Sequence, residues 1–120
     1  MTGTGGGRRY ERAFHRVSYG EPDRPPLVLD GGLRGMVADC SESGVRFRPH
    51  PRDPLPPFGA LVAGRIDFRA AGPTPFAGRV VRVAADEVAL YLPPPGGIPF
   101  RAILAEQRAL RARYPFARPE

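Results

Sequence analysis

The chain has 120 residues and a net charge of +6, from 18 basic and 12 acidic side chains. This length fits one domain, and the positive charge fits an anionic partner without choosing among nucleotide, nucleic acid and lipid. All 18 basic residues are arginine, which suggests a compositional bias. The positions of the arginines are therefore more informative than their number.

Cysteine and histidine are too sparse for a disulfide or a metal site. Cys40 is the single cysteine, which excludes an intrachain disulfide and fits a reducing compartment. His15 and His50 stand far from it in the sequence, so no metal-ligand cluster is expected. No window approaches the roughly 18 apolar residues of a membrane span, and residues 1–7 lack the apolar core of a signal peptide. We expect a cytoplasmic protein.

The chain begins with polar segments and continues with short apolar runs. Residues 1–7 are rich in Gly and Thr and predict a disordered lead, and the polar residues 8–16 predict an arm that is mobile without ligand. Between residues 17 and 92, alternating apolar positions predict about six short strands. Asp30-Gly31 predicts a hairpin, the stretch 39–44 predicts the turn between strands 33–40 and 45–48, and the loop 71–75 separates strands 59–69 and 76–83.

Short strands with regular turns and no intervening helix favour an all-β fold, a small six-stranded antiparallel barrel of the split-barrel type. One helix is predicted at residues 99–114, followed by a tail at 116–120. Its apolar residues fall on one face and predict packing across an open end of the barrel; the alternative is a partner or dimer surface. These residues are Phe100, Ile103, Leu104, Leu110 and Tyr114.

Two clusters carry side chains suited to a polar ligand. Arg12 and Arg16 are four residues apart and share one side of either a helix or a strand. At the end of strand 33–40, Asp39 and Ser41 are expected to project one way and the intervening cysteine the other way. Gly44 offers a positive φ or a close backbone approach. Taken alone, the second cluster also fits an ordinary hairpin loop.

In this order and spacing, Arg12-x-x-x-Arg16 followed by Asp39-x-Ser41-x-x-Gly44 resembles the PilZ family, bacterial domains that bind cyclic di-GMP. The resemblance covers roughly residues 8–115. It implies ligand contacts from all five residues, with Arg8 and Arg9 as candidates for further phosphate or base contacts. Arginine forks match the guanine O6/N7 edge and phosphates, and a carboxylate accepts from the guanine N1–H and N2–H₂ edge. No cofactor is implied.

The resemblance implies a second-messenger receptor whose arm orders on ligand binding and changes the surface that a downstream protein reads. Family members bind the ligand singly or as an intercalated pair, and both stoichiometries stay open. Two alternatives keep the barrel: a protein-interaction adaptor that does not respond to ligand, and a basic barrel that binds RNA or single-stranded DNA. An enzyme is not expected, because strand alternation places Cys40 inside the barrel, where a thiol is inert.

Overall fold

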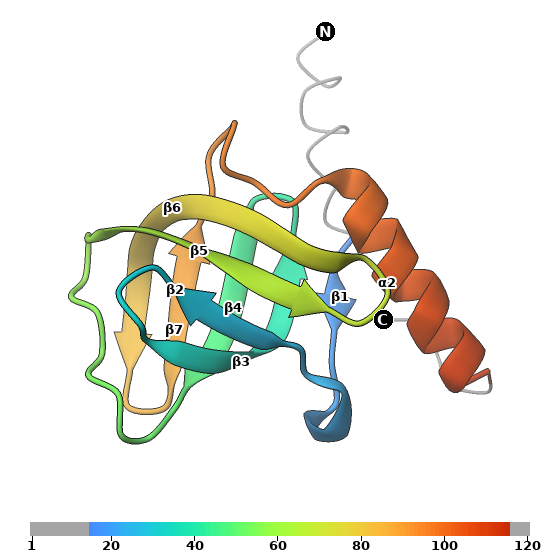
Figure 1. The fold of residues 1–120 in the computed structure, drawn as a ribbon, viewed down its shortest axis with the longest axis horizontal. Helices are drawn as coiled ribbons and strands as arrows, with labels where there is room; N and C mark the ends of the chain where they lie inside the picture. Colours follow the sequence, from blue (N-terminus) through green and yellow to red (C-terminus); the bar gives the residue numbers. More distant parts are fainter. Residues whose placement is uncertain (1–14, 116–120) are drawn as a thin grey trace, which may run out of the picture.

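A computed structural model of the protein describes residues 15–115, and in this part of the chain seven strands form one antiparallel sheet (Figure 1). The strand order is β1-β3-β2-β5-β6-β7-β4, and a further pairing of β3 with β4 closes six of the strands into a barrel. β1 is an extra strand on the edge of β3. The predicted six-stranded antiparallel barrel is confirmed. The strands are β1 (Val17–Ser18), β2 (Pro26–Leu29), β3 (Arg34–Ser41), β4 (Gly44–Pro49), β5 (Leu61–Phe68), β6 (Gly72–Ala84) and β7 (Glu87–Tyr91).

The barrel interior is filled by the apolar residues that alternate along each strand. In β4, Val45 and Phe47 are buried whereas Arg46 and Arg48 face outward, as the alternation predicts. The other strands contribute inward residues in the same way. They include Leu27, Val37, Cys40, Ile66, Phe68, Phe76, Val80, Val88 and Leu90.

β3 contains one extra residue, Ala38, opposite its partner strand. Val37 pairs with Phe47 and Asp39 pairs with Arg46, so nothing on β4 stands opposite Ala38. Its carbonyl accepts a hydrogen bond from the backbone N–H of Tyr19 at 2.9 Å. This β-bulge shifts the alternation by one residue, so that Asp39 leaves the face that Val37 occupies while Cys40 remains inside.

β6 begins at Gly72, within the segment 71–75 that the sequence predicts to be a loop, and that prediction is wrong. Phe68 pairs with Gly72, and the turn between β5 and β6 is correspondingly short. Pro73 and Pro75 lie within β6. The N–H of Ala77 points away from β5, to the carbonyl of Gly96 at 2.9 Å. Because this direction repeats every second residue, the two prolines replace N–H groups that would not bond to β5.

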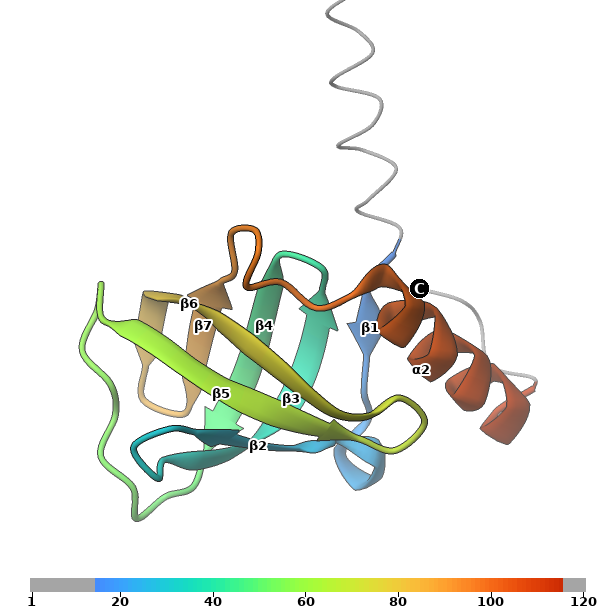
Figure 2. The same cartoon turned by 45° about the horizontal axis from the view of Figure 1, so that its top comes forward.

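The helix α2 (Phe100–Arg113) lies against β1 and the β5–β6 turn at one end of the barrel (Figures 1 and 2). Its bounds agree with the prediction of a helix at 99–114. The predicted packing face is only partly correct, because Ile103 is buried but Phe100 is exposed. The helix is rotated so that Ala102 and Glu106 share the buried face with Ile103.

Glu106 explains why a charged residue is buried in this packing face. Its carboxylate accepts hydrogen bonds from the Tyr19 hydroxyl at 2.6 Å and from the backbone N–H groups of Ala70 and Ala71 at 2.8 and 3.1 Å. Burial, together with this hydrogen bond, raises the pKa of Tyr19, so the phenol stays protonated and donates. The Glu106 side chain therefore joins α2 to Tyr19, which follows β1, and to the β5–β6 turn.

The far end of α2 is fixed to the short 3₁₀ helix η1 (Glu21–Asp23). Arg113 approaches the carboxylate of Asp23 to 2.9 Å, and the Tyr114 hydroxyl donates to the same carboxylate at 2.6 Å. The pKa of Tyr114 is raised, chiefly because its proton is held in this hydrogen bond. Tyr114 thus contributes its polar end to helix docking, in contrast to the apolar role that the sequence predicts.

Candidate functional site

The second sequence motif occupies the hairpin between β3 and β4. Asp39 and Ser41 are at the end of β3, Glu42 and Ser43 form the turn, and Gly44 begins β4. The turn is held from outside: the N–H of Ile98 donates to the Glu42 carbonyl at 2.9 Å, and the N–H of Leu92 donates to the Ser43 carbonyl at 2.8 Å. The segment that follows β7 therefore fixes the hairpin tip in place.

The sequence suggests two reasons for glycine at position 44, a positive φ or a close backbone approach. Gly44 does not have a positive φ. The described glycines with positive φ are Gly32, Gly59 and Gly72. A Cβ built on Gly44 would lie 3.5 Å from the Leu90 carbonyl oxygen, which is an ordinary contact. The hairpin alone would thus accept a larger residue here.

Asp39 is buried, with 4% of its surface exposed, although it lies on the outer face of the barrel. Its cover is Arg46, directly opposite on β4. The Arg46 Nε donates to Asp39 Oδ2 at 2.6 Å, and Nη2 donates to the same oxygen. The Nη1 of Arg46 also lies 3.5 Å from a carboxylate oxygen of Glu87 on β7. The hydrogen bond to Asp39 raises the pKa of Arg46, so the guanidinium is permanently charged.

Arg46 is absent from the residues that the sequence motifs predict for the site. A signal for its partnership exists in the chain: a two-residue turn at 42–43 sets Ser41 opposite Gly44, and counting back two places sets Asp39 opposite Arg46. The pair is a direct consequence of hairpin register.

Arg16 brings the first motif to the same carboxylate. Its Nη1 lies 3.8 Å from Asp39 Oδ1, and 54% of its side chain is exposed. Arg8, Arg9 and Arg12 lie outside the described residues. The two arginines at Asp39 thus differ: Arg46 makes short hydrogen bonds to one oxygen, whereas Arg16 makes a longer, half-exposed contact with the other.

The start of the described chain rests on α2. The Nε2 of Gln107 donates to the Arg16 carbonyl at 3.1 Å, and the ring of His15 meets the ring of Phe100 edge-on with centroids 4.8 Å apart. His15 and Arg16 are therefore held against α2.

A hollow of about 620 Å³ lies beside these groups, in the size range of small-molecule sites. Arg16, Ser41 and the hairpin turn form part of its wall, and the proline-rich segment after β7 forms the rest. Tyr91 also lines it, and the guanidinium of Arg79 lies over the tyrosine ring at 5.3 Å from the centroid. The lining residues are Arg16, Ser41, Glu42, Ser43, Tyr91, Leu92, Pro94, Pro95, Gly97 and Ile98.

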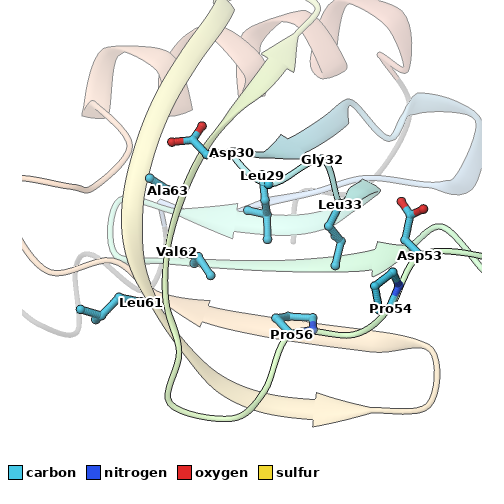
Figure 3. A pocket seen from close by; sticks show the side chains of 11 residues that line it. Leu29, Asp30, Gly32, Leu33, Asp53, Pro54, Pro56, Leu61, Val62 and Ala63 are labelled. Atoms are coloured by element: carbon cyan, nitrogen blue, oxygen red, sulfur yellow. The ribbon is translucent and has the colours of Figure 1, made fainter.

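Another hollow, of about 510 Å³, lies between the β2–β3 hairpin, the loop at 53–56 and the start of β5 (Figure 3). Its walls are mostly aliphatic side chains and prolines, with Asp30 and Asp53 as the acidic members. The Asp53 carboxylate is bound by Arg34, which lowers the pKa of the acid. None of the motif residues lines this hollow, so the candidate site is the one beside Ser41.

Three other kinds of feature have little support within residues 15–115: a reactive cysteine, a metal site and a membrane-spanning helix. Cys40 is in the barrel interior, and burial raises the pKa of its thiol to about 12, so the thiol is protonated and inert at neutral pH. Among the described residues there is no group of three or more His, Cys, Asp or Glu that could hold a metal ion. In this part of the chain no helix has the length and apolar character needed to cross a membrane.

Comparison with known proteins places this geometry in a family. The family model of the PilZ domain matches residues 8–115, and the chain therefore belongs to the PilZ domain family. The fold is similar to that of the PilZ domain of YcgR from Escherichia coli, a structure with c-di-GMP, with a TM-score of 0.67 at 14% identity. The likeness covers 85% of this chain and 95% of that one.

A second structure, the uncharacterised Legionella protein Lpg0364, gives a TM-score of 0.47 at 13% identity over 83% of this chain and 95% of that one. No curated protein matches the chain.

Proposed function

We propose that this protein is a receptor for cyclic di-GMP that binds its ligand at the hollow beside the β3–β4 hairpin. The observation that carries the proposal is the meeting of Arg16 and Asp39, 3.8 Å apart, although they come from segments 23 residues apart in the sequence. The family to which the chain belongs and the ligand in the YcgR structure both support this assignment.

The ligand would take over the weaker of the two contacts on Asp39. Arg46 holds Oδ2, which leaves Oδ1 as the acceptor for the guanine N1–H and N2–H₂ edge. Arg16 now covers Oδ1 with a contact longer than a hydrogen bond and exposed to solvent, and such contacts contribute at most about 1 kcal/mol. Arg16 can therefore turn from the carboxylate to a phosphate or a guanine edge at small cost.

The remaining motif residues complete the proposed site. The Ser41 hydroxyl lines the hollow and accepts only a long hydrogen bond, 3.4 Å, from the Ser43 N–H, so it is available to the ligand. Gly44 would allow close approach of a base, since the hairpin itself does not require glycine there. Arg12 would add the second guanidinium fork, with Arg8 and Arg9 as further anion contacts. Tyr91 offers an aromatic surface for stacking.

Residues 8–16, the predicted arm, would transmit ligand binding to a downstream protein. Ligand binding would order residues 8–16 over the hairpin, because arginines in this segment would then be fixed on the phosphates and bases. A downstream protein would read the ordered arm and the α2 surface next to it. We place this activity in the cytoplasm, in keeping with a single buried thiol.

Isothermal titration calorimetry with cyclic di-GMP tests the proposal on Arg16→Ala and Asp39→Ala. Losing a charge-assisted contact in a partly desolvated site should weaken binding by roughly 1.5–3 kcal/mol. Arg65→Ala is a matched control, because Arg65 is also 54% exposed and also pairs with an aspartate, Asp67, on the same strand β5. Unchanged affinity in both site variants, or an equal loss in the control, contradicts the receptor assignment.

A further inference from the structure

The outward face of α2 carries three arginines that form no ion pair with any residue in 15–115. Arg101, Arg108 and Arg111 are exposed, and α2 has no other exposed acidic or basic residue except Arg113, which is bound to Asp23. At 100° per residue the three lie within an arc of about 80°, on the opposite side from the buried face. We name these three residues the arginine face.

Arginines elsewhere on the molecule are often neutralised by a nearby carboxylate, so composition alone does not produce such a face. On the barrel, four outward arginines each approach an aspartate to 3.2 Å or less. These are Arg34 with Asp53, Arg46 with Asp39, Arg48 with Asp86, and Arg65 with Asp67. The only acidic residue of α2, Glu106, is buried and engaged with three donors. Within residues 15–115, three positive charges without a carboxylate partner are therefore gathered on one side of the helix.

We propose that the arginine face is a docking surface for an acidic segment of a partner protein. Arg101 and Arg108 are separated by about 10.5 Å along the helix axis, and Arg108 and Arg111 by about 4.5 Å. Carboxylates one and two turns apart on a partner helix have the same spacing. Guanidinium forks bind carboxylates in a bidentate manner, which gives such a contact direction as well as attraction.

The same face is poorly suited to a bilayer. Leu104 lies within the arc and is partly buried, and Ala105 and Ala112 border the arc, so no fully exposed large apolar side chain projects for insertion. The exposed aromatic residues of the helix ends are already in use: Phe100 contacts His15, and Tyr114 bonds to Asp23.

A nucleic-acid strand is also disfavoured on this face. Proteins that bind single strands place aromatic rings among the basic residues so that bases can stack. The arginine face has no aromatic residue between its arginines. The face thus offers guanidinium groups without a stacking surface, which suits the carboxylates of an acidic protein segment better than a strand of bases.

The arginine face adjoins the flank of α2 on which the arm begins. Gln107 and Phe100, which contact Arg16 and His15, precede Arg108 and Arg101 by one residue each. A partner on the face would therefore sit beside the proposed ligand arm. Any response of docking to cyclic di-GMP rests on the proposed receptor function, whereas docking itself does not.

Fluorescence anisotropy with a labelled helical peptide of Glu and Ala, without cyclic di-GMP, tests the docking surface in the full chain. Changing the three arginines of the face to Glu should weaken binding of the peptide by about tenfold or more, since each pair is lost and replaced by repulsion. The neutral variant, with all three changed to Gln, should give an intermediate loss. Because the side chains point outward, unfolding curves of the variants should match the wild type.

The control is a second triple variant, Arg52→Glu, Arg69→Glu and Arg82→Glu, on exposed barrel arginines that also have no carboxylate partner among the described residues. Each triple variant changes the charge by six units, from +6 to zero. Loss confined to the α2 variant supports the proposal, and equal loss in both triple variants overturns it. Tighter binding of anionic phosphatidylserine vesicles or of single-stranded DNA, dependent on the same three residues, also overturns it in favour of that other partner.

Discussion

Replacing Arg46 by alanine tests whether the buried carboxylate of Asp39 depends on a permanent cationic partner. The change removes the hydrogen bonds from Nε and Nη2 and leaves only the Arg16 contact at 3.8 Å. Breaking a fully buried pair costs about 3–5 kcal/mol, and breaking an exposed one costs about 1 kcal/mol or less. Asp39 is buried but Arg46 is 46% exposed, so we expect a loss of about 2 kcal/mol in the free energy of unfolding.

Urea unfolding measures this loss, and Arg48→Ala provides a closely matched control. Arg48 is two residues further along β4, is 47% exposed and also bonds one aspartate, but that aspartate, Asp86, is 73% exposed. Its removal should cost less than about 1 kcal/mol. A double-mutant cycle with Asp39→Asn should show coupling between positions 39 and 46. Equal effects of the two alanine variants, or absence of coupling, would refute the reasoning.

Two further predictions concern buried groups. Glu106→Ala should lower the free energy of unfolding by about 3 kcal/mol, because one hydroxyl and two backbone N–H groups lose their acceptor. The exposed control Gln107→Ala should lower it by less than about 1 kcal/mol. Similar urea midpoints for the two variants would contradict this expectation. Burial raises the pKa of Cys40 from 9.0 to about 12, so the unfolded thiol loses its proton first as pH rises. The contribution of Cys40 to stability is therefore complete below pH 9.0 and is lost towards pH 12, which urea unfolding of wild type and Cys40→Ala across that window measures; a constant difference between the two proteins would show the thiol to be solvated.

Local patterns predicted the barrel well because each hairpin carries its own signal. Asp30-Gly31 marks the β2–β3 turn, and alternation assigns Val45 and Phe47 to the core. The sequence does not predict the start of β6, because prolines normally exclude a strand. Only the pairing with β5 shows that Pro73 and Pro75 stand where no N–H group is needed for that pairing. That information depends on which strand becomes the neighbour.

The site was partly predictable for a related reason. Asp39 and Ser41 belong to a compact motif, and their turn follows from it. By contrast, the partners of Glu106 are 87 and about 36 residues away in the sequence, so no periodicity along α2 could favour a glutamate on its buried face. For the same reason, the apolar pattern of the helix predicted Phe100 on the packing face, whereas Phe100 is 38% exposed and contacts His15.

The single extra residue at Ala38 has a consequence for how this chain can vary. Asp39 and Cys40 are neighbours on opposite faces of β3, and a shift of one position would exchange them. Deleting Ala38 would remove the bulge and leave Val37 and Asp39 as consecutive residues opposite Phe47 and Arg46, so Asp39 would stay outside and Cys40 inside. The loss would be the carbonyl that accepts the Tyr19 N–H. A slip of the whole strand by one residue, by contrast, would turn the carboxylate into the aliphatic interior and present the thiol to solvent.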